Sequence, residues 1–379
     1  MQLKTYLFNN GEWNEKLDKN LDSSKTLVIV FGSINISKIK KGLDDILSCY
    51  SNSTIIGCST AGEIYQSEVF DDSISISVIH FEKSRFRVVT KEVKEEDSFK
   101  TGKEIVNELK EDDLKSIFIL SNVLSVNGSE LTKGINENLP KNCAVTGGLA
   151  GDGVNFNKTW IIVDNQFVEN YICIVGLYGD SLRVNYGCKS GWRRFGIDRK
   201  VTHSFDNILY SLDNKPALEL YKKFLGRKSL SESTLNFPLM VFEDGQKEAK
   251  FRAIKAINEE NSSIILAGNI PQNSIVSFAM AKFDDLINGA EEASEQIYKG
   301  YNNKEVALCL GVSCIARRVV LKQQVEDELE AIVDTLGKNV STVGFYSYGE
   351  FSKGKSDYCD FHNQTMALTL IYEVLDDNK

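Results

Sequence analysis

The stretch "TIIGCSTAGEI" (Thr54–Ile64) holds the pattern on which the rest of the chain is built. It begins with apolar, β-branched residues typical of a buried strand and runs into a turn that contains glycine. The stretch "STVGFYSYGEF" (Ser341–Phe351) repeats this order and spacing. The matching positions are Gly57, Thr60, Gly62 and Glu63 in the first copy and Gly344, Ser347, Gly349 and Glu350 in the second. A looser copy, "CAVTGGLAGDG", carries Gly147, Ala150, Gly151 and Asp152.

Each copy lies in the same order of predicted elements. A short apolar strand and an amphipathic helix precede the turn, as in "TLVIVFGS" (Thr26–Ser33), which is followed by a helix that ends near Tyr50. Alternating strands follow it, as in "SISISVIHF". Strands that pair as hairpins beside a strand–helix–strand crossover require mixed sheets. We therefore predict an α/β fold of mixed α+β character, with duplicated β-α-β-β units forming mixed sheets covered by helices.

The chain is long enough for two domains. "NKPALELYKKFLG" (Asn214–Gly226) has a proline near the start of a predicted helix and a glycine just past its end. We place the domain boundary shortly before this helix, with one domain over residues 1–205 and the other over 206–379. A further helix is expected at about Phe283–Lys299.

Composition excludes several classes of protein. The 379 residues are 42% hydrophobic and 26% charged, and the formal net charge is −9. This balance disfavours nucleic acid as a partner, because such binding depends on neutralising phosphates. No signal peptide and no apolar run long enough for membrane insertion is present, so we expect a cytoplasmic protein. Its eight cysteines are expected to be free thiols.

Several motifs carry candidate ligand-binding groups. The first turn offers a thiol, a hydroxyl and a carboxylate on a backbone opened by glycine, at Cys58, Thr60, Gly62 and Glu63. "GGLAGDG" around Gly151 and Asp152 is either an anion-binding rim or a closely packed corner. "SGWRRFG" sets Trp192 beside two arginines, and "SCIARR" ends a strand with Cys314 and Arg317. Each of these motifs is also compatible with a purely structural role.

The stretch "YCDFHNQTM" gathers Cys359, His362 and Asn363 where a strand begins. A zinc site needs more ligands than this spacing provides, so no metal site is predicted. A cysteine–histidine nucleophile pair lacks an orienting third group, so no catalytic residue is assigned. Because Glu350 and His362 belong to adjacent elements, we expect both to face one pocket, near Arg317 and Cys314.

Together and in this order, "GCSTAGEI", "GGLAGDG", "SGW", "GFYSYGEF" and "FHNQTM" resemble the FIST sensory proteins, in which a FIST N domain is followed by a FIST C domain. The resemblance covers about residues 25–372. It implies signal transduction through small-ligand binding, with amino acids a frequent proposal, and some members of the family bind haem. It favours these pocket residues: Gly62, Glu63, Gly151, Asp152, Cys314, Arg317, Gly349, Glu350, His362 and Asn363.

These observations predict a cytoplasmic sensor that binds an amino acid or similar small molecule in a cleft between the two domains without converting it. A separate signalling protein, such as a histidine kinase or a cyclase, would carry the output. Three alternatives stay open. One is a haem-based nitric oxide sensor with His362, Cys359 or Cys314 as the axial ligand. The others are a Cys/His-dependent enzyme and an interaction module without a ligand.

Overall fold

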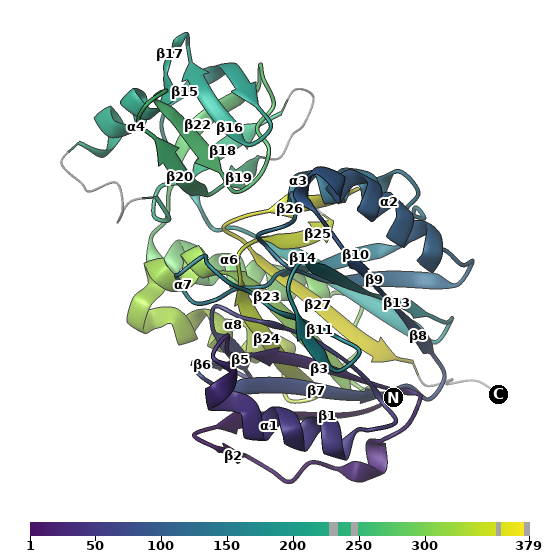
Figure 1. Ribbon diagram of the computed structural model, residues 1–379. Helices are drawn as coiled ribbons and strands as arrows, with labels where there is room; N and C mark the ends of the chain where they lie inside the picture. Colours follow the sequence, from purple (N-terminus) through teal and green to yellow (C-terminus); the bar gives the residue numbers. More distant parts are fainter. Residues whose placement is uncertain (227–233, 244–248, 354–357, 375–379) are drawn as a thin grey trace.

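The computed structural model describes residues 1–226, 234–243, 249–353 and 358–374. They form a large body of three sheets with helices outside and a smaller lobe that stands on the body (Figure 1). The predicted α/β fold of duplicated units with mixed sheets is confirmed.

The body consists of three units with one order of elements. Unit 1 contains β1 (Gln2–Asn9), β2 (Glu12–Trp13), β3 (Thr26–Gly32), α1 (Ile36–Cys49), β4 (Thr54–Ser59), β5 (Glu63–Tyr65), β6 (Glu68–Phe70) and β7 (Ile74–His80). Unit 2 contains β8 (Arg85–Glu92), α2 (Ser98–Leu109), β9 (Leu114–Ser121), α3 (Gly128–Asn136), β10 (Ala144–Leu149), β11 (Ile161–Val163), β12 (Gln166–Val168) and β13 (Tyr171–Tyr178). Unit 3 contains β14 (Leu182–Lys189), α6 (Phe283–Tyr298), β23 (Ala307–Cys314), α7 (Ile315–Leu321), α8 (Val325–Leu336), β24 (Val340–Ser347), β25 (Glu350–Lys353), β26 (Cys359–His362) and β27 (Met366–Glu373).

In each unit one pair of strands runs parallel and is joined by a helical crossover: β3 and β4, β9 and β10, and β23 and β24. The last strand of the unit lies antiparallel between the first strand of this pair and the opening strand β1, β8 or β14. A glycine occupies the same position of the second strand of the parallel pair in all three units. A Cβ there would lie 2.3 Å from a backbone oxygen of the paired strand at Gly57, 2.0 Å at Gly147 and 1.9 Å at Gly344. Only glycine permits this approach, which explains why it recurs in the three sequence copies.

The short hairpin of each unit leaves its own sheet and joins the sheet of another unit. The β5–β6 hairpin of unit 1 pairs with β24, and β11–β12 of unit 2 pairs with β4. The β25–β26 hairpin of unit 3 pairs with β10 of unit 2. The exchange closes a cycle, so each unit completes the sheet of another.

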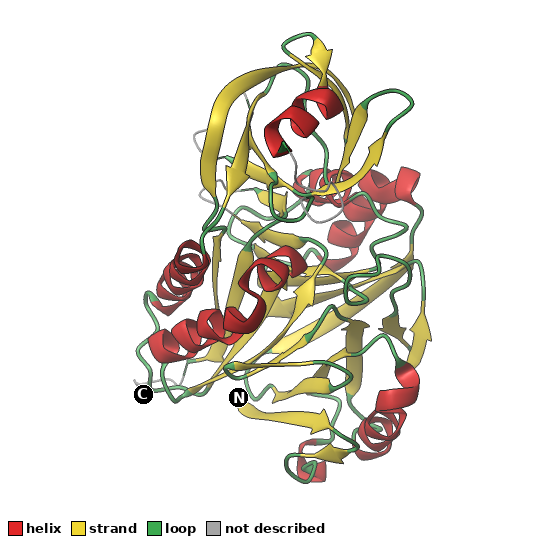
Figure 2. Ribbon diagram, turned by 90° about the vertical axis from the view of Figure 1, so that its left-hand side faces the viewer, coloured by secondary structure: helices red, strands yellow, loops and turns green. Residues whose placement is uncertain are grey.

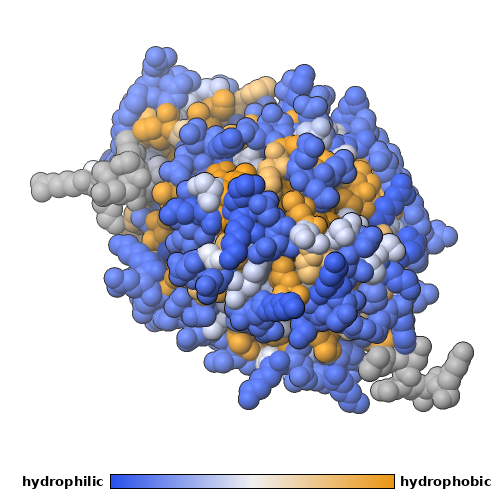
Figure 3. Space-filling model, turned by 60° about the horizontal axis from the view of Figure 1, so that its bottom comes forward, coloured by the Kyte–Doolittle hydropathy of each residue, from blue (hydrophilic) through white to orange (hydrophobic). Residues whose placement is uncertain are grey.

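The inner faces of the three sheets meet in one apolar centre. The rings of Phe31 from β3 and Phe345 from β24 stack there with centroids 4.8 Å apart. Outside, α1 covers the sheet of unit 1 through Ile39, Leu43 and Ile46. The helices α2 and α3 cover the second sheet, and α6 and α8 cover the third (Figures 1 and 2). On the face drawn in Figure 3, hydrophilic residues predominate and apolar residues show between them.

The lobe is inserted between β14 and α6 of unit 3. It contains β15 (Arg193–Phe205), β16 (Ile208–Leu212), β17 (Lys215–Pro216), α4 (Ala217–Leu225), β18 (Leu239–Phe242), β19 (Lys250–Arg252), β20 (Ile254–Asn258), β21 (Ser263–Leu266) and β22 (Ile275–Met280). Its strands form one curved sheet whose core is closed by α4 (Figure 2). The boundary predicted at residue 205 falls at the end of β15, inside this lobe, and both predicted halves contribute strands to the body.

Two buried carboxylates stand where exchanged hairpins begin. Glu63, the first residue of β5, accepts hydrogen bonds from the hydroxyl of Thr60 and from the backbone N–H and hydroxyl of Ser73, which precedes β7. Glu350, the first residue of β25, accepts them in the same way from Ser347 and from Thr365, which precedes β27. Each carboxylate thus ties the start of a hairpin to the chain that returns to the parent sheet.

Burial raises the pKa of both Glu63 and Glu350 to about 7 from 4.5. Between pH 4.5 and 7, each of these carboxyl groups is therefore protonated in the folded state and ionised in the unfolded state. We predict that stability is highest below about pH 4.5 with respect to these groups, falls between pH 4.5 and 7 and is level above that, with a total loss of about 3 kcal/mol for each carboxylate. The variants Glu63→Gln and Glu350→Gln should each flatten this part of the profile in urea unfolding at a series of pH values.

Glu68→Gln is the control, because this side chain is exposed in the neighbouring strand β6. Its profile should match that of the unchanged protein. A pH dependence that persists in the Glu63→Gln, Glu350→Gln double variant would show that other groups cause it.

Candidate functional site

A cavity of about 600 Å³ lies where the lobe meets the body. We call it the polar cavity. Its walls come from β14, the segment after it, α6 and the β25–β26 hairpin of the body, and from β18 and β19 of the lobe. The lining residues are Tyr186, Cys188, Lys189, Ser190, Trp192, Met240, Ala249, Phe251, Gln296, Lys353, His362 and Thr365. Trp192 and His362, two of the residues predicted from sequence, share this cavity.

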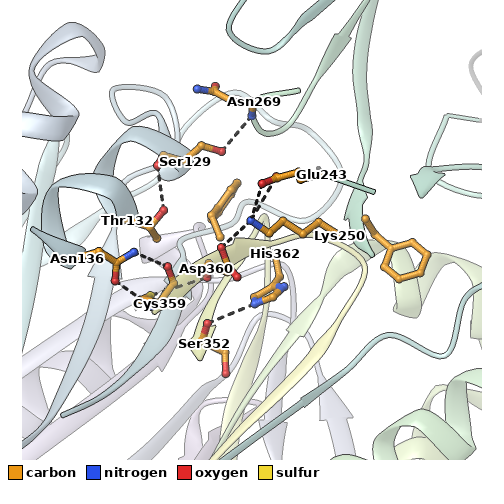
Figure 4. A network of polar contacts seen from close by, with 12 residues as sticks. Ser129, Thr132, Asn136, Glu243, Lys250, Asn269, Ser352, Cys359, Asp360 and His362 are labelled. Atoms are coloured by element: carbon orange, nitrogen blue, oxygen red, sulfur yellow. Dashed lines mark hydrogen bonds and ion pairs between the residues drawn. The ribbon is translucent and has the colours of Figure 1, made fainter. Parts of the chain in front are cut away.

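The orientation of the His362 ring is fixed by a backbone carbonyl. Its Nε2 lies 3.3 Å from the carbonyl oxygen of Ser352 (Figure 4). Because a carbonyl only accepts, Nε2 must carry the proton in this contact, which leaves Nδ1 of the neutral ring as an acceptor. Burial lowers the pKa of His362 below its usual 6.5, and the positive charge of Arg252 lowers it further against the opposing effect of Asp360. The ring is thus neutral at physiological pH.

The indole of Trp192 forms a fixed wall of the cavity. Its Nε1 donates to the carbonyl oxygen of Gln364 at 3.1 Å, and the residue is 5% exposed. The chain reaches this place through Gly191, whose φ is +76°. A Cβ at Gly191 would lie 2.2 Å from the carbonyl oxygen of Asp285, so glycine is required for the approach to α6.

Lys353 lies in the wall of the polar cavity, but its ammonium group does not face the cavity. Successive residues of a strand point to opposite faces, and Lys353 is paired with Cys359, whereas His362 is paired with Glu350 on the other face of the hairpin. Lys353 is 4% exposed, and its Nζ donates to the carbonyl oxygen of Lys141, between α3 and β10, at 3.1 Å. The ammonium group is thus held on the α3 side of the hairpin.

Glu350 lies behind the cavity wall and not in it. It is directly paired with His362 across the hairpin, but it is fully buried and its oxygens are taken by Ser347 and Thr365. Thr365 lines the cavity, so its hydroxyl links the Glu350 carboxylate to the cavity wall through a hydrogen bond. The thiol of Cys188 also lines the cavity, and burial raises its pKa to about 12, which keeps it protonated.

A network of polar contacts holds the lobe beside the cavity (Figure 4). Lys250 of β19 pairs with Asp360 of β26 at 2.8 Å and with Glu243 at 3.2 Å. Arg252, which is 4% exposed, donates to the carbonyl oxygen of Phe361 at 3.0 Å. These contacts fix the β25–β26 hairpin to the lobe. The sequence gives no sign of the contacts between the lobe and the hairpin, because Lys250 and Asp360, and Arg252 and Phe361, are more than a hundred positions apart.

The second cavity at the junction, of about 420 Å³, lies against α3, α7 and the lobe strands β20 and β21. We call it the apolar cavity. Cys314 lines it, beside the backbone of Gln364, whereas His362 lines the polar cavity. Cys314 and His362 therefore face different cavities. Cys359 lines neither cavity, and its backbone is bonded to Asn136 of α3.

Arg317 does not reach either cavity. It is fully buried. Its Nη2 lies 2.8 Å from Glu328 of α8 and also donates to the carbonyl oxygen of Leu286. Its Nε donates to Glu328, and its Nη1 donates to the carbonyl oxygen of Ser190. Glu328 also accepts from Tyr346. We expected Arg317 to hold a ligand carboxylate, but a carboxylate of its own chain takes that place.

The other predicted residues lie in the packed interior. At the start of β5, the hydroxyl of Thr60 donates to Glu63 and accepts from the N–H of Gly62. Cys58 is buried in β4. Asp152 accepts from the backbone N–H groups of residues 156–158 and follows Gly151, which packs on Ala61. Gly349 lies against the ring of Phe361. Asn363 is fully buried, and neither of its amide atoms has a hydrogen-bond partner among the described residues.

Among the described residues, no group of three or more histidine, cysteine, aspartate or glutamate side chains is arranged to hold a metal ion. The cysteines agree with the prediction, since all eight are free thiols. No helix of the described part of the chain has both the length and the apolar character needed to cross a membrane.

Comparison with known proteins gives two family matches. The FIST N domain model matches residues 26–215, and the FIST C domain model matches residues 217–353. The uncharacterized protein MJ1623 of Methanocaldococcus jannaschii is 21% identical over an alignment of 417 positions, gaps included. The alignment covers 98% of this chain and 78% of that protein. A cyanuric acid hydrolase aligns over 98% of this chain and 99% of its own, with a TM-score of 0.35 and 8% identity. That structural likeness is too weak to support any inference.

The burial of Arg317 leads to a prediction. Arg317→Met leaves Glu328 buried without its cation, and removing one partner of a buried pair costs about 3–5 kcal/mol. We expect this loss of stability in urea unfolding. Arg194→Met is the control, because Arg194 pairs with Asp198 and their side chains are 48% and 42% exposed, so its loss should change the stability by less than about 1 kcal/mol. Equal effects of the two variants would contradict a structural role for Arg317.

Proposed function

The chain belongs to the FIST family, and from this premise we propose that it is a cytoplasmic sensor of signal transduction whose small-molecule ligand binds in the polar cavity. FIST domains are associated with sensing in signal transduction. The cavity volume of about 600 Å³ lies within the range of small-molecule sites, and its place between lobe and body is typical of them.

The observation that carries the proposal is His362. Its Nε2 donates to the carbonyl of Ser352, so Nδ1 of the neutral ring is left as an acceptor in the cavity. Thr365 adds a hydroxyl. These groups favour a ligand with a hydrogen-bond donor, such as an ammonium group, at one end.

The rest of the ligand would be apolar or aromatic. Trp192, Phe251 and Met240 provide flat and flexible apolar surface in the same cavity. An amino acid supplies an ammonium group that Nδ1 of His362 can accept from. The ring faces of Trp192 and Phe251 also favour a cation. An aromatic amino acid thus suits the cavity best.

Haem is the second candidate, and the contact of His362 favours it. A histidine that donates from one ring nitrogen to a carbonyl presents the other as a metal ligand. Lys189 also lines the cavity and would suit a propionate group. His362 would be the axial ligand, and haem would supply an iron that binds nitric oxide. Cys314 and Cys359 do not share this cavity and are not candidates for ligation there.

The output would pass to a separate protein such as a histidine kinase or a cyclase. Ligand contacts with both the lobe, through Phe251, and the body, through His362, would bias how the two parts sit together. No catalysis is proposed, because Cys188, the thiol nearest to this site, is held protonated by burial.

We predict that an aromatic amino acid raises the melting temperature of the protein, because a ligand of the native state stabilises it by mass action. His362→Phe keeps a planar ring and removes the acceptor at Nδ1. It should weaken binding by about 10- to 100-fold, the range for losing one charged hydrogen bond, as measured by calorimetry.

His203→Phe is the matched control, since His203 is an exposed histidine of β15 that lines neither cavity. It should bind as tightly as the unchanged protein. Binding that is unaffected by His362→Phe would disprove the proposed contact with Nδ1, and the absence of binding by any tested aromatic amino acid would disprove the ligand class.

Reconstitution with haem separates the two candidates. If haem is the ligand, the protein should show a Soret band that moves when nitric oxide is added and disappears in His362→Ala. A Soret band that is the same in His362→Ala would exclude His362 as the axial ligand. No Soret band at all would leave the aromatic amino acid as the proposal.

A further inference from the structure

The apolar cavity is separate from the site proposed above. It is bounded by the end of β9 and the start of α3, by the loop after β10, by α7 and by β20 and β21 of the lobe. Its deep walls are Val126, Leu149, Ile254, Leu266 and Ile315, each of which is at most 7% exposed. The two cavities are divided by the segment His362–Thr365, since His362 and Thr365 line one and Cys314, bonded to the backbone of Thr365, lines the other.

Among the polar lining residues, Glu95 and Lys255 are exposed to solvent, and the less exposed Asn127 and Tyr348 are hydrogen-bonded within the chain. Asn127 caps α3 by accepting from the N–H groups of Ser129 and Glu130, and its amide nitrogen donates to Asn269 at 3.0 Å. The hydroxyl of Tyr348 donates to Asp152 and accepts from the N–H of Phe156 at 3.2 Å. Water in such a space finds few of the partners that it needs, so the cavity favours apolar contents.

One wall is held in an unfavourable backbone conformation. Phe156 has a φ of +53°, which is uncommon for a bulky residue, and its ring stacks on Tyr348 with centroids 4.1 Å apart. Asp152 fixes the loop by accepting from the N–H of Phe156 at 2.8 Å. Backbone strain of this kind persists where the surrounding structure imposes it, often at ligand clamps. The Phe156 ring, 36% exposed, thus forms a fixed flank of the cavity and its mouth.

We propose that the apolar cavity is a second ligand site, which takes an uncharged, largely hydrocarbon molecule of one or two rings or an equivalent aliphatic chain. The volume of about 420 Å³, the aliphatic walls and the satisfied polar groups define this class. The site is independent of the polar cavity, which lies on the other side of the His362–Thr365 segment.

The test uses 1-naphthol, which is uncharged at neutral pH, with the full chain. Binding is measured by naphthol fluorescence and by thermal shift. Ala267, half-buried in the cavity wall, is replaced by phenylalanine to fill the space. Ala267→Phe should weaken binding at least tenfold. The matched control is Ala256→Phe, an exposed position of β20 in the same lobe that lines neither cavity, and it should bind as the unchanged protein does.

Two further variants complete the test. Val126→Trp fills the same cavity from the body and should abolish binding in the same way, which keeps the test decisive if Ala267→Phe does not fold. His362→Phe should bind 1-naphthol as the unchanged protein does, because His362 lines only the polar cavity. The proposal is overturned if the unchanged protein does not bind 1-naphthol, if both filled variants still bind it, or if His362→Phe loses it.

Discussion

The exchange of hairpins among the three units is the constraint on which the rest of the structure depends. Each unit alone is a β-α-β crossover with two antiparallel strands, and its sheet is completed only by a hairpin from another unit. The pairing runs from unit 1 to unit 3, from unit 2 to unit 1 and from unit 3 to unit 2. No unit can therefore be removed without opening the edge of another sheet, which would expose unpaired backbone groups.

The exchange also places the candidate site. Because β25 pairs with β10, the β25–β26 hairpin stands at the edge of the sheet of unit 2, below the lobe. His362 therefore reaches a cavity whose other walls belong to unit 3 and to the lobe. Glu350, at the base of the hairpin, holds this geometry by accepting hydrogen bonds from Ser347 and Thr365. A carboxylate that a repeat places at a hairpin crossing is in this protein a structural group, and the ligand groups lie further along the same hairpin.

Much of the fold could be predicted from the sequence, because the repeat is local. Gly57, Gly147 and Gly344 align in the sequence and occupy one position in the three units, where a side chain would meet the neighbouring strand. The hairpin exchange could not be predicted, since the residues of β5 carry no mark of their partner in β24, nearly three hundred positions away. The insertion of the lobe between β14 and α6 was missed for a similar reason.

The candidate site was only partly predictable. Trp192 and His362 stand out by type in a chain with three histidines and three tryptophans, and both line the polar cavity. Glu63, Glu350 and Arg317 stand out equally by charge, yet hydroxyl groups and Glu328 bind them in the interior. Charge alone does not tell a ligand contact from an internal one, because the decisive partners, such as Ser73 and Thr365, are common residues that lie elsewhere in the chain.

Native-state hydrogen exchange tests the central claim, that the exchanged hairpins make one cooperative body of three units. The slowest amides of β3, β9 and β23, the first strands of the three crossovers, should exchange with one common free energy of opening, equal to that of global unfolding. The account is contradicted if the β23 amides open at a lower free energy while β3 and β9 stay protected, because unit 3 would then unfold without the other two.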